Sequence, residues 1–306
     1  MTPEELADRT RRAIKAAVDA GRDLGLRVER PTVLHDVFSV VVHLEPEPVV
    51  ARIPVVLTAC SDPDRQAARQ QRELDAVAWL DRHGVPVVAP ASGLPRVPVR
   101  RDGFPMTFWE LADVADDHEP YRGVGISYSA ELHGHLKGYA AELPFLAPFN
   151  DGLPDMLAGL ETAAVLTAAD IDRARSEFES LHAILSDRSA FASAFPDVPV
   201  QAIQGDGPSH NVIRTRTGIK FSDFEDVTCG PVEWDLAMMG DAAVAEYDRA
   251  AQDRGLRTTD PEVQRVMDHA RRLQFVGCVT LVPQLPLLAG PMTEALQEWR
   301  STPPFR

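Results

Sequence analysis

Residues 204–211 read Gln204-Gly205-Asp206-Gly207-Pro208-Ser209-His210-Asn211, and residues 219–225 read Ile219-Lys220-Phe221-Ser222-Asp223-Phe224-Glu225. Short stretches rich in β-branched residues flank both runs and predict strands on either side of each loop. Four residues separate Asp206 from Asn211, and Asp223 comes after a predicted hairpin. This strand–loop–strand–turn–strand path brings the two carboxylates and the amide together at one end of a small sheet.

Such a group of oxygen donors suits Mg²⁺ bound together with nucleotide phosphates, because Mg²⁺ takes hard oxygen ligands and needs few of them from the protein. A carboxylate left over can orient a substrate hydroxyl and accept its proton. The alternative interpretation is that Asp and Asn are simply common in turns, where they bond to local backbone groups. The two runs occur in the order that a phosphotransfer site requires, and this favours the catalytic interpretation.

The two runs resemble the catalytic loop and metal segment of the aminoglycoside phosphotransferase family, a branch of the protein-kinase-like fold that includes choline and sugar kinases. The family's catalytic loop usually begins His-Gly-Asp and ends in Asn, where this chain has Gln204-Gly205-Asp206 and Asn211. Residues 230–237 also resemble a Gly-Pro-x-x-x-Asp-Leu-Ala segment of the family. The resemblance implies that Asp206 is the catalytic base, that Asn211 and Asp223 hold Mg²⁺, and that Asp235 braces the catalytic loop from the start of a helix.

Pattern and resemblance together predict an α+β, bilobal protein-kinase-like fold. Residues 1–107 are expected to form a small, β-rich N-terminal lobe with an antiparallel sheet, an N-terminal helix and one inserted helix. Residues 108–112 are the predicted hinge. Residues 113–306 are the larger, mainly helical lobe, which would carry the catalytic loop, the metal segment and the acceptor site. Strands are expected in the first lobe at 32–35, 38–44, 49–53, 85–88, 97–100 and 104–109.

Kinase-like sites use a cation on the third strand, paired with an acid on the inserted helix. No lysine lies between Lys15 and Lys137, so Arg52 is expected to take that place. A guanidinium can bridge phosphate and carboxylate with two hydrogen bonds. Glu73 is its expected partner, since it shares a helical face with Val77 and an acid on an apolar face needs a cation. The alternative is a solvated arginine and a surface glutamate.

Other nucleotide contacts are predicted from the resemblance alone. The loop at residues 34–39 contains no glycine, so Ser39 is the candidate donor to the phosphates in place of glycine amides. Backbone groups from Glu110 to Ala112 are expected to bind adenine, with ATP as the nucleotide and GTP as an alternative. Residues 113–119 are acidic and could attract a cationic acceptor, although a solvated run of charges is the equal alternative.

The chain has 306 residues, with 46 acidic and 31 basic side chains and a formal net charge of −15. This balance argues against nucleic acid as a partner, because such binding depends on clustered cations. No apolar run approaches the ~20 residues of a membrane helix, so we expect no membrane partner either. The three cysteines are widely spaced, which is typical of a protein of the reducing cytoplasm. Histidines 133, 135 and 182 are interpreted as structural.

The leading hypothesis is therefore an Mg²⁺-dependent, ATP- or GTP-using kinase of a small molecule. Its acceptor could be an aminoglycoside, which would imply a role in antibiotic resistance, another amino sugar, a macrolide or a choline-like alcohol. The acceptor is expected to be cationic. The competing hypothesis is a non-catalytic nucleotide-binding protein that keeps the fold, which the glycine-free loop and Arg52 favour. The sequence does not predict the oligomeric state.

Overall fold

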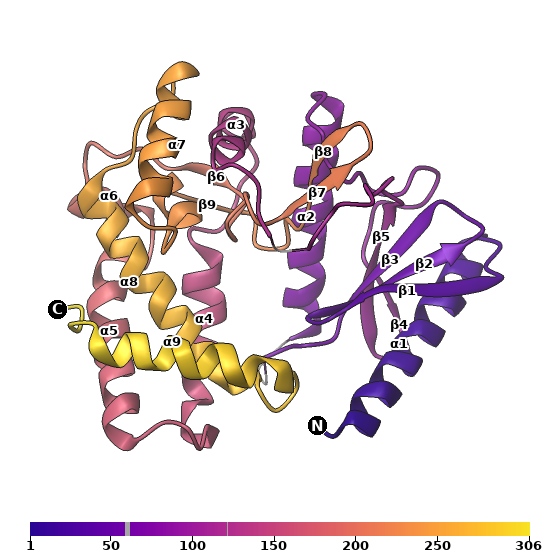
Figure 1. Ribbon diagram of the computed structural model, residues 1–306, viewed down its shortest axis with the longest axis horizontal. Helices are drawn as coiled ribbons and strands as arrows, with labels where there is room; N and C mark the ends of the chain where they lie inside the picture. The colour runs from indigo at the N-terminus through magenta and orange to yellow at the C-terminus, as the bar shows by residue number, and fades with distance from the viewer. Residues whose placement is uncertain (59–61, 121) are drawn as a thin grey trace. The chain divides into compact units, whose positions relative to one another are not determined.

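The computed structural model describes residues 1–58, 62–120 and 122–306 (Figure 1). The chain forms two compact units. The first comprises residues 1–118 with two later segments, 213–222 and 283–286, and the second comprises residues 119–212, 223–282 and 287–306. The architecture is the α+β kinase-like fold: an antiparallel sheet in the first unit and mainly helices in the second.

The first unit is built on a five-stranded antiparallel sheet in the order β1-β2-β3-β5-β4. Its elements are α1 (Pro3–Asp23), β1 (Arg30–Asp36), β2 (Ser39–Glu45), β3 (Val49–Pro54), α2 (Pro63–Arg82), β4 (Val99–Arg101) and β5 (Phe104–Glu110). A hairpin of β7 (Val212–Thr215) and β8 (Gly218–Phe221) contributes residues 213–222 to this unit. The predicted fold class and all of the predicted strands except one agree with this sheet.

Helix α1 covers the sheet with a face of small residues. Ala13, Ala16, Ala17 and Ala20 are buried on this face at helical spacing and join the apolar core of the strands. The helix begins with a capping box, in which the Thr2 hydroxyl accepts from the backbone of the third helical residue and that residue's carboxylate accepts from the Thr2 backbone. The amphipathic pattern of the first residues therefore corresponds to a helix that packs on the sheet.

The strand predicted at residues 85–88 is wrong. Val87 forms only an isolated bridge with Phe221, and no strand is assigned in this segment. Pro86 lies inside the stretch and has no N–H to donate to a ladder, so the β-branched residues around it cannot form continuous pairing. The inserted helix that the sequence predicts is α2, which begins at Pro63 with Asp62 as its N-cap; Ser61 lies outside the described residues.

A short segment close to the C-terminus completes the first unit. Gln284 donates from Nε2 to the Leu57 carbonyl at 2.6 Å and accepts from the Leu57 N–H at 3.3 Å. Arg9 donates to the Gln284 carbonyl at 3.1 Å. Residues 283–286 are thus bound to the first unit by hydrogen bonds at both the side chain and the backbone of one glutamine.

The second unit is mainly helical and carries a small two-stranded sheet of β6 and β9. Its α-helices and strands are α3 (Ser127–Leu136), α4 (Leu153–Ala158), α5 (Ala168–Leu185), α6 (Arg188–Ala194), β6 (Gln201–Ile203), β9 (Thr228–Gly230), α7 (Asp241–Asp253), α8 (Pro261–Gly277) and α9 (Ala289–Ser301). Short helical turns, most of them 3₁₀, are η1 (Pro148–Gly152), η2 (Leu160–Thr162), η3 (Val232–Leu236), η4 (Cys278–Leu281) and η5 (Pro286–Leu288). No helix within the described ranges has the length and apolar character needed to cross a membrane.

The helix that was expected to start at Asp235 begins later in the chain. Residues 232–236 form the 3₁₀ turn η3, and α7 begins only at Asp241. Gly240 separates them with φ of 83°, a left-handed value that does not continue a helix. Asp235 consequently lies in a fully buried turn and not at the start of a helix.

Candidate active site

The Asp235 carboxylate holds the backbone of the predicted catalytic loop, residues 204–211. Its Oδ2 accepts from the Gln204 N–H at 3.0 Å, and its Oδ1 accepts from the Gly205 N–H at 2.8 Å. The carboxylate is 1% exposed, and a buried charge of this kind is stabilised by hydrogen bonds to both oxygens. The loop therefore enters its turn with two consecutive amides fixed on one carboxylate.

Asp235 is in turn oriented by a buried histidine. His133 Nε2 lies 3.0 Å from Asp235 Oδ2, and His133 Nδ1 lies 2.9 Å from the Tyr247 hydroxyl. His133 is 1% exposed. Because the ring is bonded at both nitrogens, it has a structural role, as the sequence interpretation expected. Among the described residues, no group of three or more His, Cys, Asp and Glu side chains could hold a metal ion.

Gly205 is required where it stands. Its φ is +94°, and an added Cβ would lie 2.1 Å from the Asp226 carbonyl oxygen, inside contact distance. The carbonyl of Gly205 accepts two hydrogen bonds, from Trp234 Nε1 at 2.8 Å and from Arg271 at 3.0 Å. The turn that precedes Asp206 is thus fixed at both the N–H and the C=O of one glycine.

Asp206 lies directly after this glycine, with 53% of its side chain exposed. Asn211 donates from Nδ2 to the Asp206 carbonyl at 2.8 Å and, more weakly, to its Oδ2 at 3.5 Å. The guanidinium of Arg271 lies 3.5 Å from Asp206 Oδ1 and stacks 4.5 Å from the Trp234 ring centre. The carboxylate is therefore held in place by its neighbours and still open to a substrate.

The pKa of Asp206 is raised to about 7. The causes are desolvation and then the carboxylates of Asp226, Asp223 and Glu225, while Arg271 acts in the opposite direction. Since half of the side chain is in contact with solvent, we attribute the upward direction to the three like charges as well as to desolvation. A carboxylate with a raised pKa is a better proton acceptor than an ordinary aspartate.

We predict that the Asp206 carboxyl titrates near pH 7 in the metal-free protein, and that Asp226→Asn moves its titration to lower pH. The direction follows from the removal of one like charge, which stabilises the ionised form. The measurement is a ¹³C NMR titration of the Asp206 side chain, identified by its loss in Asp206→Asn. A midpoint at the ordinary value of 3.8 in the unsubstituted protein would contradict the prediction.

Asp223 is held in a strained conformation beside this loop. Its φ is +58°, in the left-handed region that non-glycine residues rarely adopt. The side chain of Gln204 donates to the Asp223 carbonyl at 2.9 Å. The glutamine that replaces the family's usual histidine thus bonds to the backbone of the second run. This strain at a candidate site is the kind that surrounding contacts maintain for function.

The oxygen atoms present fit a magnesium ion. Asp223 offers a carboxylate, and Asn211 directs the N–H end of its amide to Asp206, which turns the amide oxygen away from that carbonyl. Several carboxylates with mutual repulsion surround the position, and a divalent cation between them would relieve that repulsion. Hard oxygen ligands, few in number, are those that Mg²⁺ takes when phosphates complete its shell.

The first unit contains the predicted arginine–glutamate pair. Arg52 Nη1 on β3 donates to Glu73 Oε1 on α2 at 2.7 Å, and the two side chains are 14% and 3% exposed. A hydrogen-bonded pair this buried fixes the guanidinium relative to the sheet. The alternative of a solvated arginine and a surface glutamate is therefore wrong.

The three other residues predicted to contact the nucleotide differ in exposure and in the hydrogen bonds that they already form. Ser39 begins β2 and is 6% exposed, whereas Phe38 before it is 42% exposed. Glu110 ends β5, and its N–H already donates to the Ala89 carbonyl at 2.9 Å. The N–H of Ala112 has no hydrogen-bond partner among the described residues, so it is the donor in this segment that a base could use. The roles of Ser39, Glu110 and Ala112 stay predictions.

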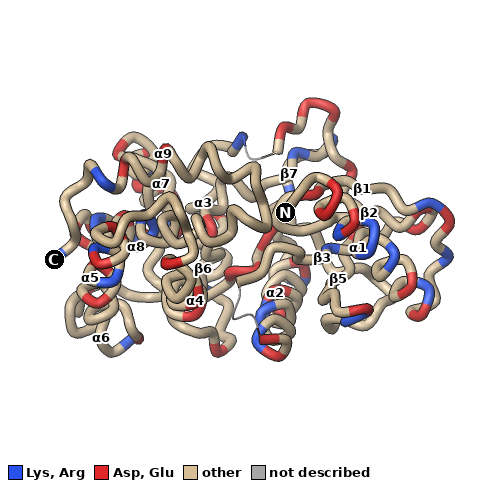
Figure 2. Tube along the Cα trace, turned by 90° about the horizontal axis from the view of Figure 1, so that it is seen from below, with Lys and Arg blue, Asp and Glu red and all other residues tan. Residues whose placement is uncertain are grey.

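The acidic run at residues 113–119 is paired. Arg216 lies 2.9 Å from Asp113 and 3.3 Å from Asp116, and Arg214 lies 2.9 Å from Asp117. All of these side chains are exposed, so each pair contributes little to stability, but together they reduce the local negative charge. Figure 2 shows acidic and basic residues interspersed along the trace. The run is therefore a weaker attractor for cations than its sequence indicates.

Comparisons with known proteins identify the family of this chain. The sequence model of the phosphotransferase enzyme family matches residues 32–269. The chain belongs to this family. Membership makes it a phosphotransferase, and the kinase-like fold is the one that the family's sequence motifs predict. A comparison with curated proteins finds no significant match.

Solved structures of phosphotransferases share the fold at low sequence identity. Choline kinase LicA from Streptococcus pneumoniae has a TM-score of 0.62 and 12% identity, with 94% of this chain and 99% of that chain covered. Amicoumacin kinase hAmiN, solved with AMP-PNP, Ca²⁺ and amicoumacin, has a TM-score of 0.62 and 15% identity, with 98% and 95% covered. A microcompartment-associated aminopropanol kinase has a TM-score of 0.60 and 16% identity, with 92% and 93% covered.

Two residues of the candidate site were not found from the sequence. Arg271, on α8, and Trp234, in η3, both bond to the Gly205 carbonyl. Arg271 is 66 positions away from that glycine, so no local pattern connects them. The one available signal was Trp234 itself, which lies one residue before Asp235 in the segment that carries the family resemblance.

Proposed function

We propose that this phosphotransferase is a magnesium-dependent small-molecule kinase that transfers the γ-phosphate of ATP to an alcohol hydroxyl, with Asp206 as the catalytic base. One observation carries the proposal. Asp206 follows a turn fixed by Asp235, Trp234 and Arg271, and its own carboxylate is exposed and has a raised pKa. A rigidly positioned proton acceptor that is open to substrate is what hydroxyl activation requires.

Each residue then has a distinct role. The hydroxyl proton of the acceptor passes to an Asp206 carboxylate oxygen as the hydroxyl oxygen attacks the γ-phosphorus and the bond to the β-phosphate oxygen breaks. Asn211 and Asp223 would hold Mg²⁺, which neutralises charge on the phosphates when it is bound. Arg52, fixed by Glu73, would bind phosphate oxygens through its guanidinium.

ATP is favoured over GTP as the donor. The observation that favours ATP is that amicoumacin kinase was solved with the ATP analogue AMP-PNP; the Ala112 N–H, which has no partner among the described residues, offers a donor to either base. GTP is the alternative, because an aminoglycoside 2′-phosphotransferase of the same fold was solved with GDP. Titration of both nucleotides against the protein by calorimetry, with Mg²⁺ present, distinguishes the two.

The acceptor is proposed to be a small alcohol that carries an amine. Choline, aminopropanol, kanamycin and amicoumacin appear in the names of proteins with this fold, and the chain's formal net charge of −15 favours a cation over an anion. The test is a nucleotide-turnover screen over amino alcohols, aminoglycosides, other amino sugars and macrolides. Saturable turnover with one class supports the proposal. Nucleotide binding without transfer to any class would favour the non-catalytic binding protein.

We predict that Arg52→Ala weakens binding of Mg²⁺–ATP by about 10–100-fold, since it removes charge-assisted hydrogen bonds to phosphate. Glu73→Ala should weaken it less, because the guanidinium remains and loses only its orientation. The double variant should resemble Arg52→Ala alone, as expected for residues in direct contact. Calorimetric dissociation constants of the four proteins form the cycle. Strictly additive effects would show that Glu73 does not act through Arg52.

A further inference from the structure

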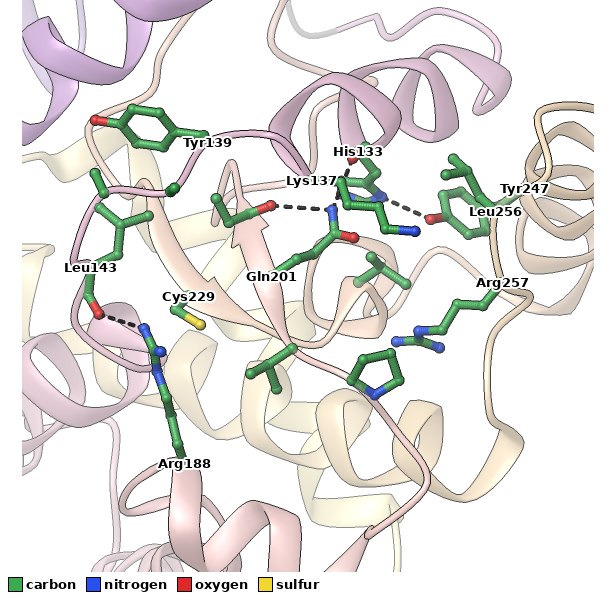
Figure 3. A pocket seen from close by; sticks show the side chains of 16 residues that line it. His133, Lys137, Tyr139, Leu143, Arg188, Gln201, Cys229, Tyr247, Leu256 and Arg257 are labelled. Carbon is green, nitrogen blue, oxygen red and sulfur yellow. Dashed lines mark hydrogen bonds between the residues drawn. The ribbon is translucent and has the colours of Figure 1, made fainter.

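A pocket of about 360 Å³ lies within the second unit, at the beginning of β6 (Figure 3). Residues 199–202 form part of its wall, and the catalytic loop follows the other end of the same strand. Asp206, Asn211 and Asp223 are not among the described residues that line it. Its volume falls in the range of pockets that bind small molecules, and the proposed phosphotransfer makes no use of it.

Three cationic side chains line this pocket, although the chain as a whole is acidic. Arg257 is compensated, because its two terminal nitrogens each lie 2.7 Å from an oxygen of the buried Glu233 carboxylate. Arg188 donates to the Leu143 carbonyl at 3.2 Å, which leaves its charge unneutralised. Lys137 forms no ion pair within the described part of the chain. The pocket therefore has two uncompensated positive charges, from Arg188 and Lys137.

The two charges lie on different sides of the pocket. In Figure 3, Lys137 is on the side of Arg257 and Tyr247, whereas Arg188 is on the opposite side, near Leu143. Gln201 and Cys229 lie between them in the same view, and the lining also includes the apolar side chains of Val200, Ala202 and Val232.

A thiol lies in the same wall without adding charge. Burial raises the pKa of Cys229, against a smaller lowering by Arg188. The thiol is therefore neutral near pH 7, where an ionised one would cancel a cation. The lining consequently combines neutral polar and apolar side chains with one uncompensated cation at each side.

We propose that this pocket binds a small organic dianion, whose two anionic groups contact Lys137 and Arg188 and whose carbon chain packs on the wall between them. A dicarboxylate and a phosphorylated carboxylic acid share this chemistry. Lys137 and Arg188 are both exposed. Two separated cations favour a ligand with two separated charges over a single anion, because each cation can then form a charge-assisted hydrogen bond with one anionic group.

We expect a ligand bound in the pocket to affect the predicted catalytic loop. His133 lines the pocket and bonds to Asp235 Oδ2, and Asp235 accepts the N–H groups of Gln204 and Gly205. Gln201, also in the lining, donates to the His133 carbonyl at 2.9 Å. A ligand that orders these walls therefore stabilises the two hydrogen bonds from backbone N–H groups to Asp235 that hold the turn before Asp206.

The binding test uses glutarate as the dicarboxylate, 3-phosphoglycerate as the phosphorylated acid, butyrate as a monoanion and inorganic phosphate, each titrated calorimetrically against the full-length protein. We expect saturable binding of at least one dianion, at least 10-fold tighter than that of butyrate or phosphate. Lys137→Ala and Arg188→Ala should each weaken it at least 10-fold. Arg175→Ala, an exposed arginine of the same unit outside the pocket, is the matched control and should leave the affinity unchanged.

The second measurement is amide hydrogen exchange over residues 201–206, with and without the dianion that binds. We expect exchange at Gln204 and Gly205 to slow at least threefold on saturation. Absence of dianion binding, equal affinity for phosphate, or unchanged affinity in both pocket variants would overturn the site. Binding without slower exchange would overturn its connection to the catalytic loop. Neither measurement depends on phosphotransfer, so these results are separate from the test of the proposed function.

Discussion

Asp206→Asn is expected to lower turnover by about 10²–10⁴-fold, the range of general-base contributions, while Mg²⁺–nucleotide binding stays close to that of the unsubstituted protein. An asparagine has the same shape and keeps the contact with Asn211, but its amide cannot accept the hydroxyl proton. The loss therefore falls on the chemical step and appears in the turnover number. The measurements are a phosphate-transfer assay with the acceptor found in the screen and calorimetric titration with a non-hydrolysable nucleotide.

Asp223→Asn is the contrasting variant, because Asp223 is assigned to the metal. An amide is a weaker ligand than a carboxylate for a hard dication. The variant should therefore lose the part of its nucleotide affinity that depends on Mg²⁺, and it should also lose turnover. Titrations with and without Mg²⁺ separate the two variants. Wild-type Mg²⁺–nucleotide binding in Asp223→Asn would contradict the metal assignment, and wild-type turnover in Asp206→Asn would contradict the base.

Gly205→Ala is the second large effect that we expect. The new methyl would meet the Asp226 carbonyl, and the residue would keep a φ of +94°. Left-handed strain costs about 1–3 kcal/mol, and overpacking adds about 1–3 kcal/mol. Because the loop must shift to relieve the contact, turnover should also fall by about 10²-fold, as for misplacement of a reacting group by about 1 Å. Thermal unfolding and the transfer assay measure the two effects.

Gly255→Ala separates strain from steric contact. Gly255 belongs to the same unit and has φ of +65°, but an added Cβ would meet nothing within 4 Å. This control should show only the strain, with a smaller decrease in melting temperature and unchanged turnover. Equal losses of stability in the two variants would show that the close approach to Asp226 does not determine the loop.

The sequence predicted those parts of the site that are local in the chain. Asp206, Asn211 and Asp223 occur within 20 positions, and turn residues between short strands indicate how such a segment folds. The Arg52–Glu73 pair was also predictable, because a helical face identified the acid and the absence of lysine identified the cation. These inferences combined residue spacing and charge with the family resemblance and with the cation–acid pair that kinase-like sites use.

The remaining features depend on packing that no local pattern records. Arg271 reaches Gly205 from a helix 66 positions away, and β9 is only three residues long, too short for a periodic signal. The incorrect strand at 85–88 has the opposite cause: the β-branched residues gave a strong signal, while Pro86 removed the hydrogen bond that the ladder needed. The pairing of residues 113–119 with Arg214 and Arg216 likewise depends on the position of the β7–β8 hairpin.

The hydrogen bonds of Gln284 have a consequence for synthesis of the chain on the ribosome. The first unit includes residues 283–286, so residues 1–118 lack part of their unit until residue 286 has been added. At roughly 5–20 residues per second, addition of residues 119–282 takes about 10–30 s. During that interval the carbonyl and N–H of Leu57 have no Gln284 to bond. The nascent first unit is therefore completed only after residues 283–286 have been synthesised.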